Sequence, residues 1–200
     1  MRKKIIVTVL SLMMLLITST SYACNFQISF FGDPKEKIFK KPAQKQKQAQ
    51  SNKIIKSTKK LNQKMPLIPF VLSDEFGGEE FTVPIQAICR NDPSLNGTFV
   101  TYFYIENKLT QIRLERNNMN DRKLLDYAMK KYGKFNLPQS IPKEKWRGSH
   151  YWKIGNDLII YAVFDIPDGQ TELIEITSTL YAAALNEYST KKGKWEDSQK

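Results

Sequence analysis

The hydrophobic pattern divides the chain into three parts. An almost unbroken apolar run covers 5–17, the stretch 35–64 has no sustained periodicity, and regular patterns begin after it. Alternating apolar and polar residues are typical of half-buried strands, and apolar residues three and four apart are typical of amphipathic helices. Residues 65–190 are therefore expected to form one domain of ordinary size, followed by a polar C-terminal tail over 191–200.

Strand-like patterns dominate the folded part. They cover 81–89, 98–105, 109–116, 150–154, 157–166 and 171–180. Turn-forming residues such as Pro167-Asp168-Gly169 separate several of them. Pro84 removes one ladder hydrogen bond, so the first stretch is expected at an edge of the sheet or as an irregular strand. The acidic, glycine-containing stretch 73–81 is expected to be a loop.

Two segments show helical spacing. The first begins near Asn120, a residue type that caps helix N-termini, and ends at Gly133, a residue type at which helices commonly stop. Its apolar residues share one face: Leu124, Leu125, Ala128, Met129 and Tyr132. The same spacing returns at 180–188, again after two strands. The pattern predicts an α+β fold, a single domain of mostly antiparallel β hairpins with one or two packed helices, in which a ββα unit repeats over 98–132 and 158–190.

The first residues have the layout of a secretory signal peptide. Basic residues precede the apolar run, and the small residues Ser21 and Ala23 fit a cleavage site. The apolar run is shorter than the roughly 20 residues that a membrane-spanning helix needs. Cleavage would remove 1–23 and leave Cys24 as the first residue of an exported protein, periplasmic or secreted.

Cys24 and Cys89 are the two cysteines of the chain. In an exported protein, two cysteines are expected to form one disulfide. A bacterial lipoprotein signal also cuts before a cysteine, so a lipid anchor on Cys24 is the alternative, although the bulky Tyr22 argues against it. The mature N-terminal segment, 24–34, is then either tied to the domain or held at a membrane.

The positive charge is concentrated in one segment. The chain has a formal net charge of +11, but 35–64 alone has eleven lysines and a single acid, Glu36. Residues 65–200 are almost neutral, with 17 basic and 18 acidic residues. A Lys/Gln-rich segment buries too little apolar surface to offset its ordering entropy, so a disordered basic tether is expected. An anionic envelope surface suits it, a soluble spacer is the alternative, and no nucleic acid is expected because interleaved aromatics are missing.

The residue types that enzymes use are sparse. His150 is the single histidine, and neither metal-ligand spacings nor a glycine-rich phosphate loop occur, so no catalytic residue, metal or cofactor is expected. Glu79 and Glu80 are the candidate carboxylates of an alternative hypothesis, a hydrolase acting on cell-wall or polysaccharide material. A solvated acidic loop is the simpler interpretation of these two residues.

Aromatic residues are the other candidate feature. Trp146, Tyr151 and Trp152 are candidate contacts for a protein partner, and Trp146 and Trp195 are expected to be exposed. A β core rich in aromatics explains most of the other rings. The sequence favours an exported, non-catalytic envelope protein that binds a protein partner or acts as an accessory or inhibitory factor. A lipid-anchored exclusion or immunity protein of a mobile element is a further alternative that depends on Cys24.

Overall fold

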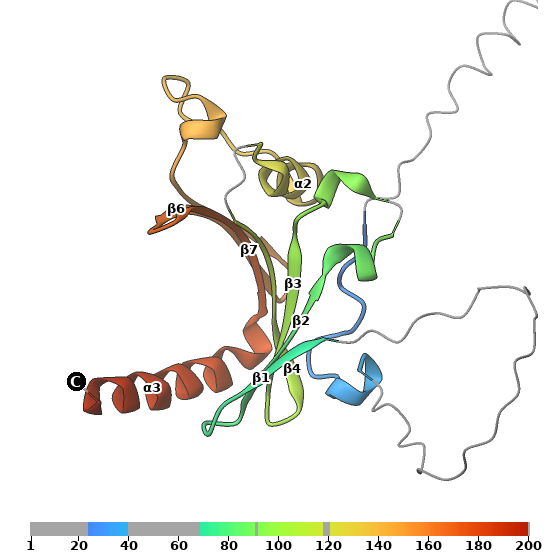
Figure 1. The fold of residues 1–200 in the computed structure, drawn as a ribbon, viewed down its shortest axis with the longest axis vertical. Helices are drawn as coiled ribbons and strands as arrows, with labels where there is room; N and C mark the ends of the chain where they lie inside the picture. Colours follow the sequence, from blue (N-terminus) through green and yellow to red (C-terminus); the bar gives the residue numbers. More distant parts are fainter. Residues whose placement is uncertain (1–23, 40–68, 91, 118–120, 200) are drawn as a thin grey trace, which may run out of the picture.

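The computed structural model describes residues 24–39, 69–90, 92–117 and 121–199 (Figure 1). The predicted signal peptide, most of the predicted tether and the expected cap at Asn120 lie outside these residues. Within them, a seven-stranded antiparallel sheet and two α-helices form the α+β fold that the sequence predicts. No helix among the described residues is both long and apolar enough to cross a membrane.

All neighbouring strands of the sheet run antiparallel, in the order β1-β2-β3-β4-β7-β6-β5. Their bounds are β1 (Phe70–Ser73), β2 (Gly78–Pro84), β3 (Phe99–Ile105), β4 (Lys108–Asn117), β5 (Gly148–Ile154), β6 (Asp157–Ile166) and β7 (Gly169–Ser178). The turn between β3 and β4 uses Glu106 and Asn107, both with positive φ, as a tight hairpin turn requires.

The order of elements repeats once. β3 and β4 are followed by α2 (Lys123–Tyr132), and β6 and β7 are followed by α3 (Ala182–Ser198). β4 and β7 pair with each other, so the two hairpins meet inside the sheet. Short 3-10 helices occupy Lys35–Lys37, Ile85–Ala87, Pro93–Leu95, Lys143–Lys145 and Thr179–Tyr181. The predicted ββα pattern is therefore visible in the order of elements.

One face of the sheet, here called the covered face, lies against α2 and the N-terminal segment (Figure 1). Its buried side chains alternate along the strands: Val100 and Tyr102 on β3, Ile112 and Leu114 on β4, Ile159 and Tyr161 on β6, and Ile174 and Ile176 on β7. From α2, Leu124, Leu125 and Ala128 complete this layer without exposure to solvent. Burial of this continuous apolar surface is the main source of stability.

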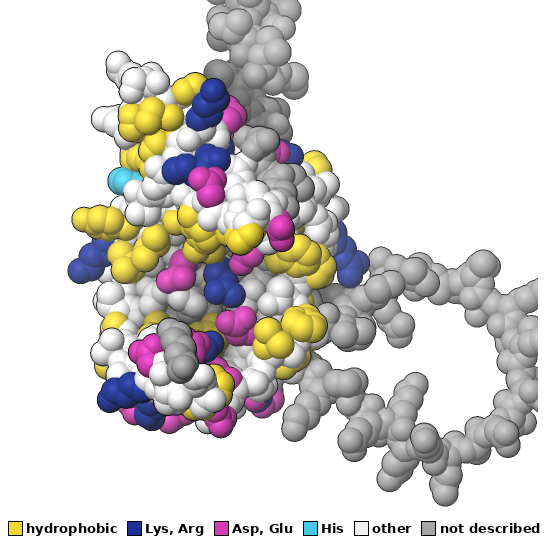
Figure 2. Space-filling model, turned by 60° about the vertical axis from the view of Figure 1, so that its left-hand side comes forward, with side chains coloured by type: hydrophobic (Ala, Val, Ile, Leu, Met, Phe, Trp, Pro, Cys, Tyr) yellow, Lys and Arg dark blue, Asp and Glu magenta, His cyan; other side chains and the backbone are white. Residues whose placement is uncertain are grey.

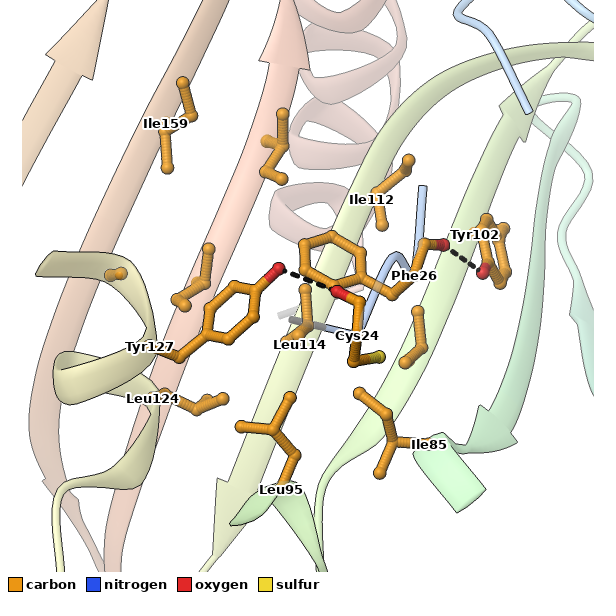
Figure 3. Packing of buried hydrophobic residues seen from close by; sticks show 14 of the residues in the cluster. Cys24, Phe26, Ile85, Leu95, Tyr102, Ile112, Leu114, Leu124, Tyr127 and Ile159 are labelled. Atoms are coloured by element: carbon orange, nitrogen blue, oxygen red, sulfur yellow. Dashed lines mark hydrogen bonds between the residues drawn. The ribbon is translucent and has the colours of Figure 1, made fainter. Parts of the chain in front are cut away.

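The segment 24–34 belongs to this core and does not hang free (Figure 3). Phe26 is fully buried, and its carbonyl oxygen accepts a hydrogen bond of 2.6 Å from the Tyr102 hydroxyl. The Tyr127 hydroxyl of α2 donates to the Cys24 carbonyl oxygen at 3.1 Å. Cys24 and Phe26 therefore fill the space between α2 and the sheet, whereas Ile28 and Phe30 further along the segment are exposed.

Cys24 and Cys89 form a disulfide, as predicted from the cysteine count, with their Cα atoms 5.5 Å apart. The Cys24 sulfur is thereby engaged, and this favours the disulfide over a lipid anchor at the same atom. Stable disulfides persist in oxidising compartments and are rare in the cytosol. The bond indicates that the folded protein works outside the cytosol.

Three expected boundaries are wrong. The predicted tether 35–64 begins with folded residues, because Phe39 is buried and stacks on Phe81 with ring centroids 4.6 Å apart. The predicted tail 191–200 is helical as far as Ser198. Its lysines and glutamate favour helix, and the single glycine, Gly193, weakens the helix without ending it. The predicted loop 73–81 contains the turn between β1 and β2 together with the first residues of β2, which β3 pairs from Gly78 onwards.

Pro84 also has a different place from the one expected. It is the last residue of β2, and the chain then enters a 3-10 helix at Ile85. β2 lies between β1 and β3, so it is not an edge strand. The missing amide of Pro84 costs nothing there, because the ladder ends at that residue.

Candidate functional site

The second face of the sheet, here called the open face, presents the side chains that alternate with the covered ones. Tyr151 of β5, Phe99 of β3 and Phe164 of β6 lie on it and are 70%, 51% and 45% exposed. Figure 2 shows hydrophobic side chains spread across this side of the molecule, with charged side chains between them. The exposed face of an antiparallel sheet is ordinarily polar, so these aromatic rings are unusual.

A group of charges occupies the middle of the open face. The Arg113 guanidinium lies 3.5 Å from a Glu80 carboxylate oxygen and 3.8 Å from one of Glu115. Glu175 is directly opposite Arg113 in the register between β4 and β7. Burial raises the pKa of Glu175, while Arg113 and Gln111 act against that rise. One arginine therefore stands among three carboxylates in the middle of this face.

Helix α3 leaves this face near the β1–β2 turn and then projects away from the sheet (Figure 1). Tyr188 packs edge-on against Phe103 with ring centroids 5.0 Å apart, and its hydroxyl donates a hydrogen bond to Asp74. A Cβ on Gly78 would lie 2.6 Å from the Tyr188 ring, so only glycine permits this approach. None of the residues of α3 is buried.

The hydrogen bond between Tyr188 and Asp74 affects the pKa of both groups. Burial and the hydrogen bond to Asp74 raise the pKa of Tyr188. Burial works against ionisation of Asp74, but hydrogen bonds from Tyr188 and from the Gly78 and Phe76 amides outweigh it and lower the pKa of that carboxyl. The base of α3 is thus fixed by one hydroxyl–carboxylate contact and one ring contact.

The three predicted contact residues do not share one surface. Trp146 is only 8% exposed and stacks over Tyr161 with ring centroids 6.0 Å apart, so its predicted exposure is wrong. Its loop folds back over the covered face, and this returns the indole to the core. Trp152 is half-buried on that same side and donates to the Gly133 carbonyl oxygen at 3.0 Å. Tyr151 alone among them lies on the open face.

Trp195 is exposed, as expected, with 46% of its surface accessible. It lies in the projecting part of α3, and its ring meets Phe76 edge-on with centroids 5.9 Å apart. The sequence suggested its exposure from the flanking charges, although it placed the residue in a tail and not in a helix.

Glu79 and Glu80 are neighbours on β2 and therefore point to opposite faces. Glu79 forms an ion pair with Lys35 on the covered side, and Glu80 faces Arg113 on the open face. A glycosidase needs two carboxylates that flank one bond in one cleft. These two residues do not converge, so they do not provide the paired site of the hydrolase hypothesis.

His150 lies among aromatic rings and not beside a nucleophile. Phe135 stacks parallel to it with centroids 4.0 Å apart, and Trp152 meets it edge-on at 4.6 Å. In the part of the chain that the structure describes, no cluster of three or more His, Cys, Asp or Glu residues could hold a metal ion. The ring therefore serves as a packing element here.

Sequence reasoning missed a buried ionic cluster beneath α2. Arg116 and Glu172 are 1% and 0% exposed, and a guanidinium nitrogen lies 3.5 Å from a Glu172 carboxylate oxygen. Arg116 also pairs with Asp121, and this hydrogen bond, partly opposed by burial, lowers the pKa of Asp121 to about 2. The alternation of β4 was the available signal, because it places Arg116 on the same side as Ile112 and Leu114.

Glu172 also replaces a helix cap. Arg122 precedes α2 in a left-handed conformation, and its side chain caps no amide of the helix. Glu172 accepts the Leu125 amide at 2.9 Å and the Tyr161 hydroxyl at 3.0 Å instead. Burial raises the pKa of Glu172, and these hydrogen bonds and Arg116 act in the opposite direction. The cluster joins α2 to β4, β6 and β7, so its role is structural.

Comparisons with protein-family models, with curated proteins and with solved structures find no match to this chain. Its function is therefore argued from its own residues. Of the features described, the open face with α3 is the one that the fold leaves without an internal role.

Proposed function

We propose that the chain is an exported, non-catalytic binding protein of the cell envelope, and that its open face together with α3 contacts a protein partner. One observation carries the proposal. The sheet is thoroughly covered on one side, whereas the other side exposes Tyr151, Phe164 and Phe99 beside a helix that buries none of its residues.

The composition of the open face supports a protein partner. Aromatic residues and arginine are enriched in protein interfaces, and interface centres contain few charges. Here the exposed rings lie on β3, β5 and β6, on either side of Arg113, which is paired with Glu80 and Glu115. A partner that covers the face would bury aromatic surface and could leave Arg113 paired with these carboxylates.

Helix α3 supports the same interpretation. An isolated helix of about this length is only marginally stable in water, and helices in proteins are stabilised mainly by packing. The two aromatic residues of α3, Tyr188 and Trp195, contact Phe103 and Phe76. The i,i+4 ion pair of Glu187 and Lys191 is exposed to solvent. A partner that packs against α3 and the open face together would supply the missing packing.

The localisation part of the proposal rests on the sequence and the disulfide. The charged, apolar and small-residue layout before Cys24 supports export, and the lysines of 35–64 support attachment to an anionic envelope surface. Because 35–39 is part of the fold, deletion of 40–64 is the appropriate test of the tether. It should weaken binding to anionic lipid vesicles in a salt-dependent way, and unchanged binding would contradict the electrostatic role.

The binding surface is tested by charge insertion. Tyr151→Lys and Phe164→Lys should each reduce recovery of the partner from envelope extracts by about tenfold or more, as expected for central interface aromatics. Ile141→Lys is the matched control, because Ile141 is 42% exposed but lies in the loop outside the sheet. Equal recovery with all three variants, each with an unchanged melting temperature, would contradict the proposal.

A further inference from the structure

The outer edge of the sheet at β1 has the composition of a pairing strand. Phe70, Val71 and Leu72 are 66%, 47% and 54% exposed, and the four residues of the strand include no charge, proline or bulge; Pro69 and Asp74 flank them. Proteins usually protect an exposed edge with such features, because its free amides and carbonyls invite another strand. The opposite edge, β5, carries Lys153 and is protected in this way.

The register with β2 determines where the β1 side chains point. Phe70 is opposite Thr82, and Leu72 is opposite Glu80, so both lie on the open face. Val71 is opposite Phe81 and points to the covered side. The strand therefore presents two large apolar side chains on one face and one β-branched side chain between them on the other.

We propose that two copies of this chain associate by antiparallel pairing of β1 with β1, about a two-fold axis through Val71. In this register Phe70 of one copy stands opposite Leu72 of the other, and Val71 stands opposite its own counterpart. Residues opposite each other in an antiparallel pair point to the same face, so both sheets keep their open faces on one side. The pattern is self-complementary, as an isologous interface requires.

A hollow beside β1 receives the Phe70 ring of the second copy. It measures about 250 Å³ and has a mixed lining, with apolar surface from Leu72, Phe103 and Tyr188 and charged groups from Asp74, Glu80 and Lys192. Phe70 of the second copy would stand directly across from Leu72. The ring can therefore lean over Leu72 towards Phe103 and Tyr188.

The proposed contact is small, because β1 has four residues. An interface of this size falls below the roughly 1,200 Å² of stable complexes, so a weak, concentration-dependent dimer is expected. Anchoring of many copies at one envelope surface would raise the local concentration and favour pairing. The contact is centred on β1, at the opposite side of the sheet from Tyr151 and Phe164, but it shares Tyr188 and Lys192 of α3 with the proposed partner surface. Variants at Tyr151 and Phe164 therefore test partner binding separately from dimerisation.

The first test is the oligomeric state of the full mature chain by sedimentation equilibrium over a range of concentrations. The wild-type protein should show a reversible dimer that Leu72→Lys abolishes. Ile154→Lys is the matched control at the opposite edge, where Ile154 is 50% exposed, and it should leave the dimer intact. A monomer at every concentration, or a dimer that Leu72→Lys does not affect, would overturn the proposal.

The second test fixes the register. Val71→Cys places two thiols directly opposite each other on the proposed axis, within the distance of a disulfide. This variant should form a covalent dimer under mild oxidation, and Ile154→Cys should not. Equal dimer yields from both variants would contradict the register. A chain that stays monomeric but binds a synthetic extended peptide at β1 would contradict pairing between two copies. Loss of dimerisation with partner recovery intact would separate this proposal from the proposed function.

Discussion

The two α-helices follow equivalent hairpins, and the same apolar spacing runs through α2 and through the 3-10 turn and first residues of α3, yet the two helices lie in opposite environments. α2 buries Leu124, Leu125 and Ala128 against the sheet, whereas α3 buries no residue. The difference lies in what surrounds each helix. α2 shares the covered face with Phe26 and receives a cap from Glu172, whereas α3 stands on the face that no described segment covers. Equal spacing along a sequence therefore does not imply equal packing.

The substitution with the largest expected effect on the packing of α2 is at Glu172. Replacing it with alanine removes the cap of α2 and leaves the buried Arg116 without its carboxylate neighbour on β7. Loss of one partner of a buried ion pair costs about 3–5 kcal/mol when the other charge is left uncompensated. Because Arg116 keeps its pair with Asp121, the loss should lie near the lower end of that range. Chemical denaturation should show a loss of this size in the free energy of unfolding.

Glu172→Gln is the control for that experiment. Its amide oxygen can still accept from Leu125 and Tyr161, so the loss should be clearly smaller than with alanine. If both variants unfold like the wild type, the cluster does not hold α2 in place.

The disulfide should have the next largest effect. Cys24→Ser combined with Cys89→Ser frees the segment that carries Phe26, and the free energy of unfolding should fall by about 2–4 kcal/mol. Reduction of the wild-type protein should produce the same loss. An unchanged unfolding midpoint in either experiment would contradict the view that the covered face depends on this link.

A pair of glycine substitutions examines the base of α3. Gly78→Ala forces a methyl group to 2.6 Å from the Tyr188 ring, and overpacking of this kind costs about 1–3 kcal/mol. Gly193→Ala, inside α3 with no atom within 4 Å of the new Cβ, should instead stabilise the helix by up to about 1 kcal/mol. Thermal unfolding followed by circular dichroism at a helix-sensitive wavelength measures the change in stability of each variant. If both variants are stabilised, or both destabilised, the contact between Gly78 and Tyr188 is not as described.

The smallest expected effect depends on pH. The Arg116 hydrogen bond, opposed by burial, lowers the pKa of Asp121 in the folded protein from 3.8 to about 2. A lowered folded-state pKa contributes stability above pH 3.8, and this contribution is lost as the pH falls towards 2. Because Asp121 is 43% exposed, screening limits it to about 1 kcal/mol or less.

Asp121→Asn should therefore lower the free energy of unfolding slightly at pH 7 and match the wild type near pH 2. Urea denaturation at the two pH values provides the comparison. A difference that persists unchanged at the lower pH would show that the Asp121 charge is not its source.

Local patterns predicted the parts of the fold that depend on neighbours in sequence. The β6 stretch 157–166 was predicted with its observed bounds, because alternation and the following Pro-Asp-Gly turn are both local signals. The disulfide followed from the count of cysteines. The α+β class followed from hairpins interrupted by helical spacing.

Long-range contacts explain what the sequence did not reveal. Trp146 looked exposed because charges flank it, but its loop returns over Tyr161. Glu79 and Glu80 are adjacent in sequence and were candidates for a carboxylate pair, but as neighbours on strand β2 they point to opposite faces of the sheet. The sequence identified Tyr151 as a contact residue, but it did not indicate that the whole face around it stays uncovered, because that depends on where 24–39 and α2 pack.

The central claim is that the open face contacts a partner, and site-specific photo-crosslinking in intact cells tests it most directly. A benzoylphenylalanine at position 164 samples the open face, and one at position 141 samples an equally exposed site outside the sheet. A partner on the open face should give a discrete crosslinked product of defined mass at 164 and none at 141. The same products at both positions, or none at either, would contradict it.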